Sequence, residues 1–411
     1  MIKFEKFTLN NGLKVIVCQD KMSALVNMNI LYNVGARDEN ENKTGFAHLF
    51  EHLMFGGSKN IPHYDTVLQN AGGENNAFTN SDFTNYYLTI PKQNLETAFY
   101  LESDRMLELN FSKKSLDVQK NVVCEEFRQR YLNQPYGDVS LFLHPLAYKV
   151  HPYQWTTIGK NINHIESATL GDVKDFFFKH YAPNNAILVV VGDVTTEKIY
   201  KLSEKWFGEI KKRNVPIRSL PEEPEQTEYQ ELTLDRNVPN DAIFMAYHTC
   251  SRLNDNYFVT DLISDILSNG KSSFFNVNLI KGKQLFSGID AYISGSYHSG
   301  LFHIAGTLYP NVNFSQAKEA INIEILKICN GDFTEAILQK VKNKFIANQQ
   351  FNQINNSDTA MDLAYYEWLG DAEMINSISE NYSNITKENI IKVAKQIFRN
   401  TNLSCILYKK I

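Results

Sequence analysis

The order of apolar and polar positions predicts short strands and helices in the first half of the chain. Apolar residues alternate with polar ones on both sides of Asn11-Gly12, a dipeptide typical of tight hairpin turns. A strand-like apolar run follows over residues 24–34. Further on, the spacing predicts strands over 76–90 and 185–191, and helices over 93–109, 112–132, 169–180 and 196–207.

A second block of elements follows a polar segment. Residues 211–228 carry several charges together with Pro216, Pro221 and Pro224, a composition that suits a linker. We therefore expect one domain over 1–210, a linker over 211–228 and a second domain over 229–411. The order of elements loosely repeats, so we predict an α+β fold of two similar halves, each a mostly antiparallel sheet packed against helices. In the second block the pattern predicts strands over 231–234, 242–248, 287–292 and 300–308, and helices over 257–268, 314–329 and 333–348.

Composition narrows the class of protein. A chain of 411 residues with 43% hydrophobic and 21% charged residues is typical of a soluble protein with more than one domain. Its net charge of −5 gives no reason to expect nucleic acid, and no apolar run reaches the length of a membrane span. The first residues lack the apolar core of a signal peptide, and the five cysteines are scattered without a C-x-x-C pair. We expect a reducing, cytoplasmic location, or the periplasm if a signal was removed before this numbering.

The most informative motif is His48-Leu49-Phe50-Glu51-His52. It falls in a predicted helix that begins at the N-cap Thr44 and stops at Gly56-Gly57. Two imidazoles four residues apart share one helix face and can bind one metal ion, with Glu51 placed to handle a proton of metal-bound water. This H-x-x-E-H order is a known metallopeptidase motif, and roughly 0.03 matches are expected by chance in a chain of this composition.

A catalytic zinc site needs a third protein ligand. The helix predicted over 112–132 offers Glu125 and Glu126. Adjacent residues point about 100° apart around a helix, so only one of the two carboxylates can face the metal. The spacing of apolar residues does not decide between them.

Several further stretches match a known family. The chain resembles the pitrilysin/insulinase family of zinc metallopeptidases, which includes the mitochondrial processing peptidase, and its bacterial members are the most similar in pattern. The resemblance covers the first half in detail and the second half diffusely, around residues 270–273. The matching stretches are residues 11–15, 32–39, 44–55, 71–73 with 76–77, 102–106, 122–126, 133–137 and 183–186.

The resemblance implies a site and a reaction. One Zn²⁺ per chain would be bound by His48, His52 and Glu126, with Glu51 as the catalytic base of peptide hydrolysis. Many relatives carry a Glu seven residues before the third ligand, whereas this chain has Gln119, which can hydrogen-bond a neighbouring group but supplies no charge. The substrate backbone is expected to pair with an edge strand formed by Asn76, Ala77, Phe78 and Thr79.

One family feature is missing. Relatives usually carry an Arg and a Tyr seven residues apart that bind substrate and stabilise the oxyanion. The aligned positions here hold Ile280 and Ser287, neither of which can donate the charge-assisted or phenolic hydrogen bond of that pair. We therefore predict a heterodimer with a homologous subunit that lacks the zinc motif, supplies this pair and encloses a chamber with this chain. The alternative is that Tyr292 or Tyr297 substitutes within the chain.

The sequence thus favours a zinc metalloendopeptidase subunit that hydrolyses peptides or unfolded segments. A catalytically silent scaffold subunit of the same family is the main alternative. A non-haem iron enzyme with two His ligands and one carboxylate is a third, although such chemistry has no use for a base at Glu51. Away from the motif, Asp104-Arg105 is interpreted as an ion pair inside the fold.

Overall fold

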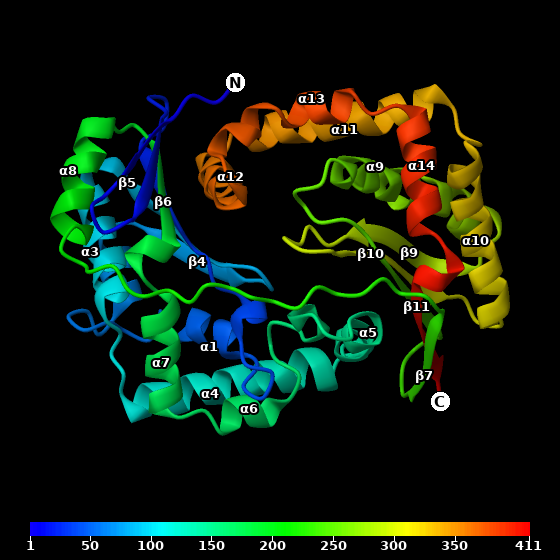
Figure 1. Cartoon of the computed structure of the whole chain (residues 1–411), viewed down its shortest axis with the longest axis horizontal. Coiled ribbons are helices and arrows are strands. Elements are labelled where there is room, and N and C mark those ends of the chain that lie inside the picture. Colours follow the sequence, from blue (N-terminus) through cyan, green and yellow to red (C-terminus); the bar gives the residue numbers. More distant parts are fainter. The chain divides into compact units, whose positions relative to one another are not determined.

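The computed structural model describes residues 1–411, and the chain forms two compact units (Figure 1). Each unit is assembled from three separate segments. Unit 1 contains residues 1–128, 155–220 and 350–377, and unit 2 contains residues 129–154, 221–349 and 378–411. The division into domains over 1–210 and 229–411 with a linker over 211–228 stays a prediction. Residues 211–228 form neither helix nor strand.

Unit 1 is built on a six-stranded sheet in the order β1-β2-β6-β3-β5-β4. All neighbouring pairs are antiparallel except β2 with β6. The Asn11-Gly12 hairpin joins β1 to β2, and Gly12 has the positive φ of 90° that a tight turn requires. Because β4 pairs only with β5, it leaves one backbone edge open. The strands are β1 (Glu5–Thr8), β2 (Lys14–Gln19), β3 (Leu25–Tyr32), β4 (Glu74–Thr79), β5 (Thr84–Pro91) and β6 (Ala186–Gly192).

Helices cover both faces of this sheet. One face packs against α12, which meets β3 and β6, and the other packs against helices that include α1 and α3 (Figure 1). The helices of unit 1 are α1 (Phe46–Leu53), α2 (Tyr64–Asn70), α3 (Leu95–Leu107), α4 (Lys113–Phe127), α6 (Ile162–Glu166), α7 (Leu170–His180), α8 (Thr196–Phe207) and α12 (Asn356–Leu369).

Unit 2 has a five-stranded sheet in the order β7-β11-β8-β10-β9, in which only β7 and β11 run parallel. The predicted α+β class with two similar, mostly antiparallel halves is confirmed. None of the helices combines the length and apolar character needed to cross a bilayer. The strands and helices of unit 2 are β7 (Gln230–Arg236), β8 (Ala242–His248), β9 (Phe286–Ile293), β10 (Leu301–Leu308), β11 (Leu403–Lys410), α5 (Val139–Ala147), α9 (Asn256–Ser268), α10 (Phe314–Asn330), most of α11 (Glu335–Asn352), α13 (Ile378–Ser383) and α14 (Lys387–Ile397).

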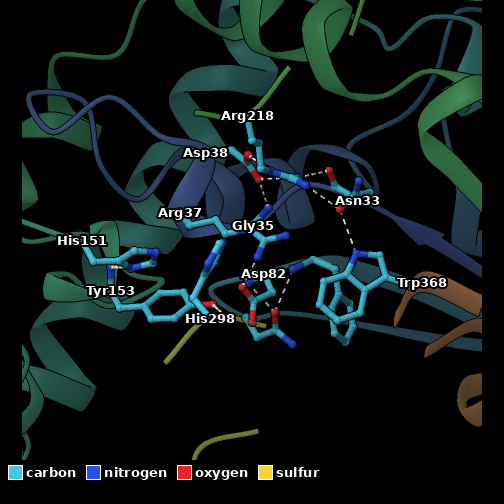
Figure 2. A network of polar contacts seen from close by, with 12 residues as sticks. Asn33, Gly35, Arg37, Asp38, Asp82, His151, Tyr153, Arg218, His298 and Trp368 are labelled. Carbon is cyan, nitrogen blue, oxygen red and sulfur yellow. Dashed lines mark hydrogen bonds and ion pairs between the residues drawn. The ribbon is translucent and has the colours of Figure 1, made fainter. Parts of the chain in front are cut away.

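A polar network joins three distant segments within unit 1 (Figure 2). Arg218 donates hydrogen bonds to both carboxylate oxygens of Asp38 and to the side-chain oxygen of Asn33. The indole of Trp368, on α12, donates to that same Asn33 oxygen at 2.8 Å. The charge-assisted bonds of Arg218 attach its segment to the end of β3, and the neutral bond from Trp368 attaches α12 to the same place.

A second buried network corrects the interpretation of Asp104-Arg105 as an ion pair. The guanidinium of Arg105 instead binds the carboxylate of Glu102, with donor–acceptor distances of 2.8 and 2.6 Å. Asp104 accepts from the hydroxyl of Ser58 and the backbone N–H of Asn60. Adjacent residues of a helix point in different directions, so Asp104 and Arg105 do not face each other on α3. Residues three apart, such as Glu102 and Arg105, do.

We expect Glu102→Gln to be strongly destabilising, because it leaves the fully buried Arg105 without its carboxylate. The cost should be about 3–5 kcal/mol in the free energy of unfolding, measured by urea titration. Adding Arg105→Met should recover much of it, since the uncompensated charge is then gone. The exposed ion pair of Lys59 and Glu108 is the control, and Glu108→Gln should cost under about 1 kcal/mol. Equal costs for Glu102→Gln and Glu108→Gln would contradict this account.

Candidate metal centre

The helix that carries the motif, α1, begins differently from the sequence prediction. Thr44 is not its N-cap. The N-cap is Gly45, with a φ of 88°, and the hydroxyl of Thr44 instead accepts from the backbone of Lys160. Glu39 provides the capping bonds, because its two carboxylate oxygens accept from the backbone N–H groups of Gly45 and Ala47 at 2.9 and 2.8 Å. Burial raises the pKa of Glu39 to about 8, although these two bonds oppose the shift.

The packing of α1 fixes which way the motif faces. Leu49 and Phe50 are fully buried, and the Phe50 ring stacks on Phe176 at a centroid distance of 4.9 Å. His48 and His52 lie on the less buried side of the helix, with their rings 4.9 Å apart and nearly perpendicular. The apolar positions therefore anchor α1, while the two imidazoles face a partly open space.

The second element of the site is α4, which packs against α1. It begins at the N-cap Ser112, whose hydroxyl accepts from the N–H of Ser115. The Oε2 atom of Glu126 lies 3.6 Å from His48 Nε2 and 3.4 Å from His52 Nε2. Of the two carboxylates that the spacing left open, Glu126 is thus the one next to the imidazoles.

Glu125 lies elsewhere. Its side chain is 59% exposed and forms an ion pair with Arg128, one turn further along the chain. Since adjacent helix positions diverge by about 100°, the packing of α4 against α1 that brings Glu126 to the imidazoles turns Glu125 into solvent.

The three side chains fit a divalent metal ion. His48, His52 and Glu126 each offer one ligand atom, and these atoms all lie within 4.8 Å of one another. Their side chains are between 12% and 25% exposed, so they are reachable but largely shielded. Two imidazole nitrogens and one carboxylate oxygen are a donor set of catalytic zinc sites, which keep a fourth position for water or substrate. The same donor set is used by non-haem iron.

Glu51 lies beside this cluster on α1 and is half-buried. Burial raises the pKa of the hydroxyls of Tyr86 and Tyr181, and the charge of nearby Glu51 raises both further. The two phenols therefore stay protonated at neutral pH. Their hydroxyl oxygens lie 3.4 Å apart. Nothing in the sequence indicated that Tyr86 and Tyr181 lie near the motif, because they are on β5 and just after α7, far from it in the chain.

Gln119 lies on α4, two turns before Glu126. Its side-chain amide is close to Gly56, just beyond α1. Its expected role beside the metal ligands stays a prediction.

The residues expected to bind substrate lie on β4, the edge strand, which packs against α1. The side-chain oxygen of Asn76 accepts the backbone N–H of Ala77 at 2.8 Å. Phe78 packs edge-on against Phe83, and Thr79 ends the strand. A peptide that adds to this edge must displace the Asn76 oxygen to reach the Ala77 N–H.

The positions that the resemblance aligns with an Arg and a Tyr of the family lie in unit 2. Ile280 is in the π-helical segment Phe275–Gly282, and the Ser287 hydroxyl donates to the carbonyl of Thr307 within the sheet. Tyr292, on β9, stacks on His303 at a centroid distance of 4.8 Å, and Tyr297 lies in the loop that follows β9.

Comparison with known proteins agrees with this fold. Residues 14–161 match the family described as "Insulinase (Peptidase family M16)", and residues 167–345 match "Peptidase M16 inactive domain". The chain belongs to this family, the pitrilysin/insulinase family of peptidases.

Individual relatives show which peptidases of this family the chain is similar to. The chain is 29% identical to the zinc protease PqqE of Helicobacter pylori, over 99% of this chain and 93% of the relative. A crystal structure of a protease from Helicobacter pylori superposes with a TM-score of 0.95 at 29% identity, over the full length of both chains. The β subunit of the mitochondrial processing peptidase of Saccharomyces cerevisiae is 28% identical over 51% of this chain and 45% of its own length. The relatives are thus named as zinc proteases and as a processing peptidase subunit.

Proposed function

We propose that the chain is a zinc-dependent endopeptidase subunit that hydrolyses peptides or unfolded segments. The observation that carries the proposal is the meeting of His48, His52 and Glu126 from two helices, with Glu51 beside them and an open strand edge against the same helix. A silent scaffold has no need to keep all of these together.

Each residue has a distinct role in this proposal. His48, His52 and Glu126 hold the ion, which when bound makes water acidic and polarises the scissile carbonyl. Glu51 accepts the proton of the attacking water and returns it to the leaving amine. The tight anchoring of α1 by Glu39 and Phe50 keeps the base at a fixed position relative to the ligands.

Substrate is held by strand addition at β4. Backbone hydrogen bonds to this edge bind any extended peptide with little dependence on its side chains, which suits a processing or degrading enzyme. A folded protein cannot offer a free strand, so we expect short peptides and unfolded segments to be the substrates.

A second subunit completes the site in our proposal. Ile280 and Ser287 offer neither the charge-assisted hydrogen bond of an Arg nor the phenolic one of a Tyr, and one relative is itself named as a β subunit. A homologous partner without the zinc motif would supply the missing Arg and Tyr and close a chamber with this chain, forming a heterodimer.

The test is a fluorogenic peptide assay of the zinc-loaded chain, alone and mixed with the homologue from the same genome that lacks the HxxEH motif. We expect mixing to raise kcat by about a hundred-fold, the usual value of an oxyanion donor. Chelation should abolish the activity and zinc should restore it. Full activity of the isolated chain would refute the need for a partner and favour Tyr292 or Tyr297. No hydrolysis by the mixture, and no zinc in it, would favour the scaffold.

A further inference from the structure

A small cavity of about 230 Å³ lies inside unit 2. The start of α5 and the turn before it form one wall, and β8, β9 and β10 form the other. Since α5 packs chiefly against β7, β8 and β11, the cavity lies where the helix no longer covers the sheet closely (Figure 1). All of these segments belong to unit 2, so the cavity is a feature of that unit alone.

The register of the strands shows which side chains project into this space. His303 on β10 pairs with Ala246 on β8 and with Tyr292 on β9. Directly paired residues of an antiparallel ladder point to the same face of a sheet. Ala246 belongs to the buried cluster that includes Val139 and Leu143 of α5, so this is the face on which α5 lies. His303 and Tyr292 therefore project on the α5 side, where both line the cavity.

His303 is a buried polar group without a partner in the chain. Only 8% of the residue is exposed, and no group of the chain forms a hydrogen bond with its ring nitrogens. Burial, and to a lesser extent the neighbouring His144, lowers the pKa of His303 to about 3, so the ring is neutral at physiological pH. A neutral imidazole has one N–H donor and one acceptor nitrogen. Leaving both unpaired costs free energy that a bound polar group would recover.

Tyr292 covers one face of the His303 ring. The ring centroids are 4.8 Å apart and the ring planes differ by 14°. Such stacking leaves the edge of the imidazole free, and both nitrogens lie on that edge. Tyr292 is itself 51% exposed, so it stands at the mouth of the cavity and a molecule can enter beside it from the solvent.

The lining of the cavity favours an uncharged aromatic ligand. It contains no Asp, Glu, Lys, Arg or Cys, so a charged molecule would lose its hydration without gaining a charged partner, and a metal ion would find no thiol or carboxylate. The rings of Tyr136, Phe244 and Tyr292 favour contact with another aromatic ring. The Tyr136 hydroxyl already donates to the carbonyl of Asn240 at 2.7 Å, so His303 is the group left to bond the ligand.

We propose that this cavity binds a small uncharged aromatic molecule that carries one N–H or hydroxyl group. The aromatic ring lies between α5 and β10, and its polar group forms a hydrogen bond with a nitrogen of His303. An indole or a phenol has this chemistry. About 150 Å³ is enough to hold benzene in a protein interior, so the cavity has room for one ring or two fused rings. The inference depends neither on zinc nor on hydrolysis.

The test compares two probes of the same shape. Indole and indene have the same fused rings, but indene has a CH₂ group where indole has its N–H. Calorimetric titration of each probe into the full, zinc-loaded chain gives Kd. We expect indole to bind about tenfold more tightly, the usual value of one net hydrogen bond. N-acetyltryptophanamide carries the same ring on a peptide backbone, for which the cavity has no room, and it should bind more weakly than indole.

Substitutions then locate the binding. His303→Phe keeps a ring against Tyr292 but removes both nitrogens, so the affinity for indole should fall about tenfold, to that for indene. Ser140→Phe, in the α5 wall, fills the space and should abolish binding of both probes. The matched control is His180→Phe. His180 is also 8% exposed but lies in unit 1, so its replacement should leave both affinities unchanged. Thermal denaturation without probe shows that each variant is folded.

Several outcomes would overturn the proposal. Equal affinities of the unmodified chain for indole and indene, or binding of neither, would mean that the cavity has no such ligand. Unchanged indole binding by the Ser140→Phe chain would place the probe elsewhere. Tighter binding of N-acetyltryptophanamide than of indole would assign the cavity to a protein side chain instead of a free molecule. If His303→Phe does not fold, the preference for indole in the unmodified chain and the loss of binding in Ser140→Phe decide the question.

Discussion

Replacing Glu51 by Gln is expected to leave zinc bound and to lower kcat/KM for peptide hydrolysis by about a thousand-fold, the usual value of a positioned general base. Gln has the same size as Glu and can still hydrogen-bond water, but it cannot take up a proton. Metal content by elemental analysis and hydrolysis of a fluorogenic peptide with the partner subunit give the two readouts. Because Glu51 is not among the clustered ligand atoms, its loss should not change zinc stoichiometry.

The control for this substitution is Glu41→Gln, an exposed position in the loop before α1. It removes the same charge close to the same helix, so it should retain both zinc and activity. If Glu51→Gln loses zinc, the residue is a ligand rather than a base. If it keeps near-normal hydrolysis, the reaction does not proceed by the proposed proton transfer.

The second large effect is expected at Glu126. Replacing it with Gln removes the only anionic member of the ligand cluster, so zinc affinity should fall by more than the hundred-fold that a lost supporting contact can cost. Hydrolysis at limiting zinc should fall with it. Competition with a chromogenic chelator measures the affinity directly.

Glu125→Gln is the matched control, one residue away on the same helix. Its carboxylate is exposed and paired with Arg128, so zinc affinity should stay within a few-fold of the unmodified chain. A larger loss of zinc from Glu125→Gln than from Glu126→Gln would mean that α4 is rotated about its axis relative to the arrangement described above.

Local pattern was sufficient to predict the motif helix and most strands. The spacing of His48 and His52 places both on one face of any helix, whatever it packs against. The orientation of α4 about its own axis could not be predicted in this way, because its contacts with α1 determine which residues face the imidazoles. For that reason the spacing left Glu125 and Glu126 open, and only the family resemblance pointed to Glu126, which the structure places beside the imidazoles.

The features that sequence could not predict all depend on long-range contacts. The cap of α1 comes from Glu39 rather than the adjacent Thr44, because Gly45 takes the positive φ that turns the chain into the helix. The position of α12 depends on its contacts with β3 and on the bond from Trp368 to Asn33, the residue after β3 and 335 residues away in the chain. No periodicity within α12 reveals which sheet it will cover.

The interleaved make-up of the two units has a consequence for biosynthesis. A nascent chain emerges from the ribosome N-terminus first, yet the sheet against which the histidine-bearing helix α1 packs stays uncovered on its other face until residue 377 has been translated. Domains that fold as they emerge do so once their last segment is available. The metal ligands are therefore translated long before the last segment of the unit that holds them.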